Sequence, residues 1–515
     1  MPITHPNLHL TKLPGAIPAW SGEISSGNLQ SICQRVRDGG GRLVALWGSD
    51  ERDAGNGYAL HIALVIEKGL INLSLRLPAA HPGYPDISGI FPAAERMQRA
   101  ACDLLGIYPE DRGHRKWLRH GAWDRGSFPL RKDFDAASSR TDEADDYAFV
   151  QVEGQGVHEI AVGPVHAGII EPGHFRFSVV GEKTLRLEER FGYAHKGIEK
   201  RFESLDVQQA SKLAGRVSGD STVAYAWAYA MAAESIAAVT PPDRALWLRA
   251  LFLERERIAN HLGDLGMLGN DVALSFGFAQ FWILKEQVLR HNAALFGHRY
   301  LMDKIIPGGV AADLAESGKD TLLEECAMLE RGVHVLRSIY EEHAGMQDRF
   351  IGAGRVEPKL AAQLGLCGLA GRASSQSWDA RVQFPCAPYD KLDVHMATYR
   401  NGDVAARVIV RFDELFESLR LQSAIVTNLI QDNTLGEPLV KLPAAGFGVG
   451  MVEGWRGEVL VAIHTDAKGN LARVHPHDPS WQNWPVLEHA VMGNIVPDFP
   501  LINKSFNLSY SGHDL

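Results

Sequence analysis

The stretch from Arg216 to Glu234 constrains the fold of this chain more than any other. It reads Arg-Val-Ser-Gly-Asp-Ser and continues as Thr-Val-Ala-Tyr-Ala-Trp-Ala-Tyr-Ala-Met-Ala-Ala-Glu. Ser218, Asp220 and Ser221 are residue types that cap a helix N-terminus, and the alanines that follow let other elements approach the helix backbone closely. We therefore expect a tight turn that opens into a buried helix at the centre of a domain.

Two pairs of residues in this chain share one spacing. Ser218 and Ser221 stand three positions apart at the start of the expected helix, so their side chains point into the same space. Ser509 and Gly512 repeat that spacing close to the C-terminus. Helix capping alone is the simpler explanation of the first pair. The second pair is what favours a common site, because a Cys-x-x-Cys metal motif presents its two sulfurs at the same spacing.

Composition excludes several classes of protein. The chain has 515 residues, 45% of them apolar and 22% charged, which is typical of a globular protein with more than one domain. A net charge of -10 and a pI of about 6.1 argue against a nucleic-acid-binding surface. The five cysteines have no metal-like spacing, which indicates a reducing compartment. We expect no secretory signal and no membrane-spanning helix, so any membrane attachment would come through partners.

Three segments divide the chain. Residues 1–135 contain an amphipathic helix and short apolar runs typical of strands, and we expect a small α/β domain there. Residues 136–146 are polar and acidic, which is the composition of a linker. Residues 147–515 contain the buried helix and further long helices. The expected fold class is α+β, in which the second domain has a central helix bundle and a flanking β-sheet. The long helices are predicted at residues 245–265, 277–301, 320–343 and 407–433.

Several motifs along the chain resemble one superfamily. The two spaced pairs, the loop Gly163-Pro-Val-His and the helix Leu253-Glu-Arg-Glu-Arg-Ile-Ala-Asn-His resemble the large subunit of nickel-iron hydrogenases and the large (49 kDa) core subunit of respiratory complex I. Within the hydrogenases, the membrane-bound energy-converting group, which includes hydrogenase-4 and formate hydrogenlyase, is the most similar. Residues 104–114 and 128–135 resemble the smaller (30 kDa) complex I core subunit. The resemblance implies that residues 1–135 brace an assembly and hold no redox centre.

The resemblance also implies a lost metal site. Hydrogenases carry Cys-x-x-Cys at both spaced pairs, whereas the matching positions here are Ser218, Ser221, Ser509 and Gly512. Nickel and iron need soft thiolate ligands, but serine hydroxyls are hard and neutral near pH 7, and glycine offers no side chain. We therefore expect no nickel-iron centre. A hydrogenase with replacement ligands is strongly disfavoured for the same reason.

Further residues match the superfamily near this site. His166 matches the first histidine of the complex I quinone loop, but Ile170 stands at the second, and Gly219 stands where complex I carries its quinone-binding tyrosine. The resemblance to a quinone site of the complex I type therefore fails at two positions. The candidate cavity or proton-transfer groups are His166, Glu171, Asp220, Ser221 and Asp271.

Two residues match positions beside a partner's cofactor. Arg216 and His261 resemble positions next to the proximal iron–sulfur cluster of the neighbouring small subunit. Simpler explanations stay open for several other residues: a loop-stabilising role for His166, a surface position for Glu171, and a buried Glu254–Arg257 ion pair. Similarly, Arg372, Asp379 and Arg381 form either a structural set of ion pairs or part of the cavity wall.

Two classes of function remain. The first is the large subunit of a membrane-associated, complex I-like oxidoreductase that couples electron transfer from a neighbouring iron–sulfur cluster to proton or ion movement, with a quinone as one candidate acceptor. Its expected partners are a small iron–sulfur subunit, a ferredoxin-like subunit and membrane ion-translocating subunits, at the cytoplasmic face of the cell membrane. The second is a non-catalytic scaffold or regulatory subunit of such a complex. A sizeable polar cavity between Ser218, Ser509 and Glu171 would favour the first class, and dense packing there would favour the second.

Overall fold

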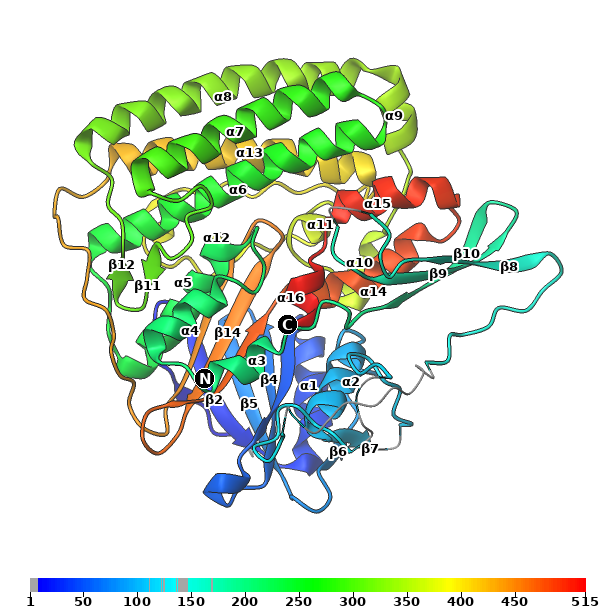
Figure 1. Ribbon diagram of the computed structural model, residues 1–515, viewed down its shortest axis with the longest axis vertical. Coiled ribbons are helices and arrows are strands. Elements are labelled where there is room, and N and C mark those ends of the chain that lie inside the picture. The colour runs from blue at the N-terminus through cyan, green and yellow to red at the C-terminus, as the bar shows by residue number, and fades with distance from the viewer. Residues whose placement is uncertain are drawn as a thin grey trace.

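Two β-sheets, one from the N-terminal part of the chain and one from the C-terminal part, stack face to face (Figure 1). The computed structural model describes residues 8–110, 112–121, 123, 126–135, 137, 147–167 and 170–515. The first sheet has the order β1-β2-β5-β4-β3, and only the β2–β5 pair is parallel. Its strands are β1 (Thr11–Lys12), β2 (Ala19–Ile24), β3 (Arg42–Asp50), β4 (Tyr58–Ile66) and β5 (Gly69–Leu77).

The first sheet is buried on both faces. Leu60, Ile62 and Leu64 of β4 pack with helices α1 (Ser26–Asp38) and α2 (Ala94–Leu105), whereas Ala63 and Val65 belong to the core shared with the second sheet. Successive side chains of a strand point to opposite faces, so β4 serves both cores. This double burial explains why residues 59–66 are apolar without alternation, apart from His61.

The second sheet lies between the first sheet and helix α5 (Thr222–Ala237). Its strands β13 (Phe447–Glu453), β14 (Glu458–Thr465) and β15 (Leu471–His477) are antiparallel. Fourteen of the sixteen residues of α5 are buried, as the alanine-rich sequence predicts. The backbones of α5 and β13 touch, because a β-carbon at Gly448 or Gly450 would collide with the carbonyl oxygen of Ala232 or Ala228. The glycine-rich segment at 445–450 therefore serves helix–sheet packing.

Four long helices form a layer at the top of Figure 1. They are α6 (Asp243–Asp271), α7 (Ser275–Phe296), α8 (Glu316–Glu342) and α13 (Val404–Thr427). Each was predicted from its apolar periodicity, but the predicted ends were inexact. Helix α6 continues six residues beyond the predicted end at 265, because Gly266 and Gly269 leave room for Trp282 and Tyr340. Helix α7 ends earlier than predicted, at Gly297, which adopts a left-handed conformation.

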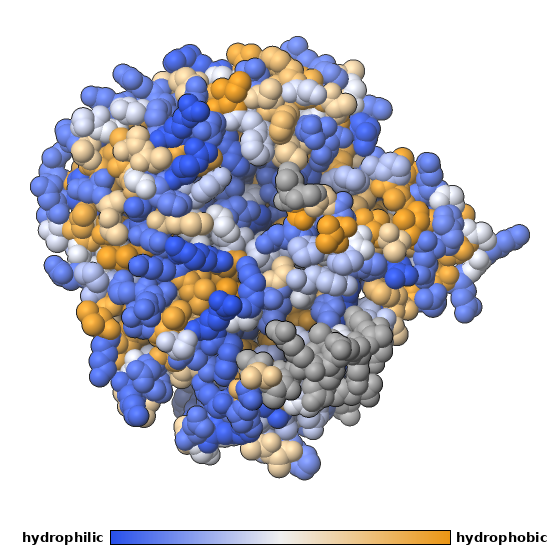
Figure 2. All heavy atoms as spheres, viewed as in Figure 1, coloured by the Kyte–Doolittle hydropathy of each residue, from blue (hydrophilic) through white to orange (hydrophobic). Residues whose placement is uncertain are grey.

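A third sheet protrudes at the right of Figure 1. Strands β8 (Val157–Val162), β9 (His174–Val180) and β10 (Lys183–Arg190) have the order β10-β9-β8, and α14 (Ser480–Val491) packs against β10. Figure 2 shows apolar residues gathered on this side of the molecule, where Val180, Leu185, Met492 and Ile495 are 40–44% exposed.

The shorter helices and strands are β6 (Gly83–Pro85), β7 (Tyr108–Glu110), α3 (Ile198–Phe202), α4 (Val207–Ala214), β11 (Ile305–Ile306), β12 (Gly309–Val310), α9 (Ala344–Phe350), α10 (Pro358–Leu364), α11 (Gly368–Arg372), α12 (Ala380–Gln383), α15 (Phe499–Phe506) and α16 (Tyr510–Asp514).

The predicted α+β fold class is confirmed. Apart from Ala137, the predicted linker at 136–146 lies outside the described residues, so the domain division at that point stays a prediction. The N-terminal unit is bound to the rest of the chain by ion pairs of Arg42 with Glu458 and of Arg96 with Glu189. None of the helices in the described ranges is both long enough and apolar enough to cross a membrane.

Candidate functional site

The turn before α5 and the last helix of the chain meet through two serines. Ser218 Oγ and Ser509 Oγ lie 3.0 Å apart and share a hydrogen bond, and both residues are buried. Ser509 also caps α16, because its Oγ accepts a hydrogen bond from Gly512 N at 2.9 Å. The two spaced pairs of the sequence therefore lie together. At 3.0 Å, the two hydroxyls leave no space between them for a ligand.

An arginine and an aspartate complete this cluster. The Ser218 hydroxyl donates to Asp220 Oδ1 at 2.7 Å, and Arg456 Nη1 donates to the same oxygen at 2.8 Å and to Ser221 Oγ at 3.3 Å. Burial opposes ionisation of Asp220, but the Arg456 guanidinium and the Ser218 hydroxyl outweigh it and lower its pKa to about 2. We call Ser218, Asp220, Ser221, Arg456 and Ser509 the hydroxyl cluster. At neutral pH its aspartate is ionised.

The carboxylate of Asp478 occupies the space beside Gly512, the last of the four positions that match hydrogenase cysteines. A β-carbon added to Gly512 would lie 2.5 Å from Asp478 Oδ2. The same oxygen accepts a hydrogen bond from the Tyr225 hydroxyl at 2.7 Å, and Ser480 N donates to Asp478 Oδ1 at 2.8 Å. Asp478 is thus held by Tyr225 of α5 and by the backbone of its own segment at Ser480.

The start of α5 is not capped by the serines. Ser221 is the cap residue, but its side chain makes no capping hydrogen bond. Instead, the carboxyl oxygens of Glu256 on α6 accept hydrogen bonds from Val223 N at 2.7 Å and Ala224 N at 3.2 Å. Burial raises the pKa of Glu256 to about 8, although the two N–H donors oppose this shift. The capping expected of Ser218, Asp220 and Ser221 is therefore wrong, because a carboxylate from another helix occupies that position.

The loop before β9 contacts the C-terminal helix rather than the hydroxyl cluster. Ser511 N donates to Glu171 Oε2 at 2.8 Å, and the Tyr510 hydroxyl lies 3.3 Å from His166 Nε2. Glu171 is exposed and His166 is half-buried. Both residues therefore hold α16 in place, and through α16 they adjoin Ser509.

Two predicted site residues lie apart from the hydroxyl cluster. Arg216 is exposed and forms an ion pair with Asp303 at 2.7 Å. Asp271, at the end of α6, lines a separate groove of about 500 Å³ together with Arg349 and Asp498. Burial raises the pKa of Asp271 to about 6. Within the part of the chain that the structure describes, no hydrogen bond or ion pair joins Asp271 to the hydroxyl cluster, so its candidate proton-transfer role stays a prediction.

His261 belongs to a buried array of ion pairs. Its Nε2 lies 3.1 Å from Glu414 Oε2, and Arg372 Nε donates to the other oxygen of Glu414 at 2.8 Å. Arg381 then joins Asp379 at 2.7 Å and Glu254 at 3.0 Å. The expected Glu254–Arg257 pair is present at 3.2 Å, so these residues form the buried ion pairs that were one of their two alternatives.

Sequence reasoning did not single out three important groups, Arg456, Asp478 and Glu256. Arg456 lies in the turn between β13 and β14, Asp478 follows β15, and Glu256 lies on α6. Each reaches the site from a different part of the chain. No local spacing could have predicted that they meet.

A nickel-iron centre does not fit these residues. The four matching positions supply three hydroxyls and no thiolate, and Asp478 and Ser509 crowd the fourth. Over the described ranges, no group of three or more histidine, cysteine, aspartate or glutamate side chains is placed to hold a metal ion.

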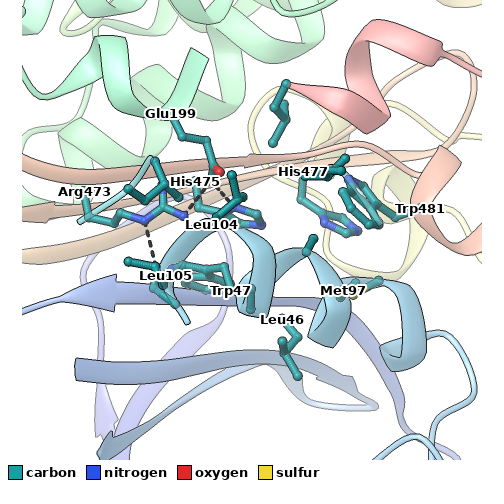
Figure 3. A pocket seen from close by; sticks show the side chains of 16 residues that line it. Leu46, Trp47, Met97, Leu104, Leu105, Glu199, Arg473, His475, His477 and Trp481 are labelled. Atoms are coloured by element: carbon teal, nitrogen blue, oxygen red, sulfur yellow. Dashed lines mark hydrogen bonds and ion pairs between the residues drawn. The ribbon is translucent and has the colours of Figure 1, made fainter. Parts of the chain in front are cut away.

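A second cavity lies where the two sheets meet (Figure 3). His475 Nδ1 and Arg473 both contact Glu199 Oε1 at 2.7 Å, and Trp47 stacks on His475 with ring centroids 4.8 Å apart. Leucine, alanine and methionine side chains of α2 and β3 close the other side. The cavity has a volume of about 20 Å³, which is enough for one water molecule but not for a quinone ring.

Comparison with known proteins identifies relatives for most of the chain. The family model for the respiratory-chain NADH dehydrogenase 49 Kd subunit matches residues 271–445, and the model for the 30 Kd subunit matches residues 23–140. Formate hydrogenlyase subunit 5 of Escherichia coli is 30% identical over 484 residues, which cover 92% of this chain and 85% of that protein. Hydrogenase-4 component G of the same organism is also 30% identical, with 92% and 84% covered.

Two further similarities connect the chain to respiratory enzymes. The C/D subunit of NADH-quinone oxidoreductase from Bacteroides thetaiotaomicron is 27% identical over 461 residues, which cover 83% of this chain and 86% of that protein. A chain of the membrane-bound sulfane sulfur reductase, an archaeal respiratory membrane complex, superimposes with a TM-score of 0.66 at 23% identity and covers 70% of this chain and 99% of that one. At this identity the superposition shows a common fold.

Proposed function

Because the chain belongs to the family of formate hydrogenlyase subunit 5 and hydrogenase-4 component G, we propose that it is the large subunit of a membrane-associated, complex I-like oxidoreductase that has no nickel-iron centre. The relatives carry the oxidoreductase part of this proposal, and the direct 3.0 Å contact between Ser218 and Ser509, at the positions that match the hydrogenase cysteines, supports only its metal-free part. Electrons would arrive at an iron–sulfur cluster of a small partner subunit. Ferredoxin-like and ion-translocating membrane subunits would complete the complex on the cytoplasmic face of the membrane.

In this proposal the chain's own residues hold and move protons. Glu171 is exposed, and its carboxylate reaches the backbone of α16, which begins at the buried Ser509. From Ser509 the hydrogen bonds continue to Ser218 and Asp220. Hydroxyl and carboxyl groups in direct contact can pass protons, as Ser509, Ser218 and Asp220 are placed to do. Glu171 is joined to them only through backbone N–H groups of α16, so in this proposal it acts at the surface end and does not hand its proton directly to Ser509. Arg456 keeps Asp220 ionised, so Asp220 serves as a fixed negative charge, and Glu171 is the proposed proton-transfer group at the surface.

A scaffold role is the second candidate, and a specific observation favours it. The hydroxyl cluster and Asp478 fill the space between α5 and α16 with direct hydrogen bonds. A quinone or another acceptor would have to separate Ser218 from Ser509 before binding between them.

The first test is analysis of metal and quinone in the complex purified intact from membranes, combined with redox titration of its clusters. We expect no stoichiometric nickel, and turnover with an acceptor that depends on an iron–sulfur cluster. Stoichiometric nickel would refute the metal-free proposal. Absence of both bound quinone and acceptor-dependent turnover would leave the scaffold.

A matched pair of variants tests the role of Glu171. Glu171→Gln keeps an oxygen that can accept the hydrogen bond from Ser511 N but cannot hold a proton, so we expect turnover to fall by about tenfold or more. Glu182→Gln, which replaces another exposed glutamate near the same sheet, should leave turnover unchanged. Equal activity of both variants in an intact complex would exclude the proton-transfer role.

A further inference from the structure

Two asparagines of this chain are followed directly by glycine, and the structure holds the two glycines differently. The two sequences are Asn56–Gly57 and Asn401–Gly402. Both asparagines are exposed. Exposure of the side chain therefore does not distinguish the two sites, and any difference between them lies in the backbone of the glycine.

An Asn-Gly sequence can react with itself and with water. The backbone nitrogen of the glycine attacks the side-chain Cγ of the asparagine, a C–N bond forms, and the side-chain amide leaves as ammonia. Water then opens the resulting five-membered ring at either carbonyl, which gives aspartate or isoaspartate. Glycine favours the attack because it has no β-carbon to restrict the rotation of its peptide group. The rate therefore depends on how freely the glycine nitrogen can turn towards the asparagine.

The peptide group between Asn56 and Gly57 makes no hydrogen bond with any residue that the structure describes. It lies at the tip of the hairpin between β3 and β4, where residues 53–56 are exposed. Two neighbouring bonds close the hairpin, from Asn56 N to Glu51 O at 3.1 Å and from Glu51 N to Gly57 O at 2.8 Å. Attack by Gly57 N thus requires rotation of one exposed peptide group that loses no hydrogen bond of its own.

The nitrogen of Gly402, in contrast, donates a hydrogen bond to Ala373 O at 2.9 Å, and Gly402 is buried. Its carbonyl oxygen accepts hydrogen bonds from Val356 N at 2.9 Å and from Arg407 Nη1 at 2.7 Å. A β-carbon at this glycine would lie 2.0 Å from Val356 O, so its backbone is tightly enclosed. Attack on Asn401 must therefore wait for local opening of the structure, which lowers the rate.

We propose that Asn56 is a site of spontaneous deamidation in the folded chain, whereas Asn401 is protected by the fold. The reaction replaces a neutral amide by a carboxylate in a turn that already carries Glu51 and Asp53. Isoaspartate also adds a methylene group to the main chain between the two hydrogen bonds that close the hairpin. This inference does not depend on the proposed function.

The test incubates the full chain in mildly alkaline buffer, because the attacking nitrogen must lose its proton, and follows both sites by peptide mapping with mass spectrometry. We expect Asn56 to be converted to aspartate and isoaspartate at least about tenfold faster than Asn401, because the Asn401 site must open first. In urea the fold no longer distinguishes the sites, and the two rates should agree within about threefold.

Asn56→Gln is the matched variant. Glutamine keeps the amide, but attack on it would close a six-membered ring, which forms much more slowly. The variant should show no gain of a carboxyl group at this position, and its Asn401 should react as slowly as in the wild type. Equal rates at Asn56 and Asn401 in the folded chain, or a reaction of Asn56 that occurs only in urea, would overturn the assignment.

Discussion

At the scale of single residues, Gly512 has little room to change. A β-carbon there would lie 2.5 Å from Asp478 Oδ2 and 2.9 Å from Ser509 Oγ, and Asp478 is held by Tyr225 and Ser480. We therefore expect Gly512→Ala to lower the free energy of unfolding by about 1–3 kcal/mol, as overpacking does in other cores. Urea denaturation measures this change.

Gly219 provides the matched control. It lies in the turn before α5, and a β-carbon there would meet no atom within 4 Å. Gly219→Ala should change the free energy of unfolding by less than about 0.5 kcal/mol. If Gly512→Ala is equally neutral, the packing between α16 and Asp478 is looser than the structure indicates.

The sequence could predict only part of the site at this scale. Ser218 and Ser509 were expected to share a space because their spaced pairs match one motif, and they lie 3.0 Å apart. Arg456 and Asp478 were not singled out, because each comes from a distant segment and neither has a spacing that marks it. The roles proposed for His166 and Glu171 rest on resemblance and stay predictions, since the structure gives only their contacts with α16.

At the scale of elements, the start of α5 depends on Glu256 of α6. In the folded chain the pKa of Glu256 is raised from 4.5 to about 8, so the folded state keeps a proton that the unfolded state releases between these values. This contribution to stability is complete below pH 4.5 and is lost as the pH rises towards 8. Glu256→Gln keeps an amide oxygen for Val223 N and Ala224 N but does not titrate.

We therefore expect the free energy of unfolding of Glu256→Gln, relative to the wild type, to rise by a few kcal/mol between pH 5 and pH 9, since each pKa unit corresponds to about 1.4 kcal/mol. Urea denaturation at several pH values measures it. Glu324→Gln, at an exposed position of α8, is the control and should give a difference that does not vary with pH. A pH-independent difference for Glu256→Gln would contradict the raised pKa.

The contact between α5 and β13 gives a second prediction at this scale. A β-carbon at Gly450 would collide with the carbonyl oxygen of Ala228, so Gly450→Ala must push the helix away from the sheet. We expect a loss of about 2 kcal/mol or more in the free energy of unfolding. Gly332→Ala, inside α8, meets no atom closer than 3.6 Å and should stabilise the chain by about 0.5–1 kcal/mol. A lower thermal midpoint for both variants alike would count against the close packing.

The sequence predicted the elements better than their ends. The periods of apolar residues located all four long helices, because a buried helical face is a local pattern. Their ends depend on tertiary packing, as when Gly266 admits Trp282 and lets α6 continue. The unalternating strand at 59–66 also needed the second sheet to explain its two buried faces.

At the scale of the whole molecule, the joint between the two sheets is rich in buried histidines. The ring centroids of His61 and His464 lie 4.5 Å apart, and Trp47 stacks between His61 and His475. Burial lowers the pKa of each of these histidines, for His464 to about 3. The positive charge of Arg473 at the joint lowers these pKa values further. Because these rings come from both ends of the chain, neutral imidazoles keep the N-terminal unit packed against the rest.

This arrangement predicts that mild acid weakens the molecule at the joint. The unfolded chain protonates its histidines near pH 6.5, whereas the folded chain keeps His464 neutral down to about pH 3, so its contribution to stability is present above pH 6.5 and is lost as the pH falls. His464→Phe keeps an aromatic ring beside His61 but cannot be protonated. Between pH 7.5 and pH 5 it should lose roughly 1–2 kcal/mol less stability than the wild type. His158→Gln, at an exposed position of β8, should follow the wild type. Identical acid dependence of all three proteins in urea denaturation would show that His464 is already protonated at pH 5 in the folded joint.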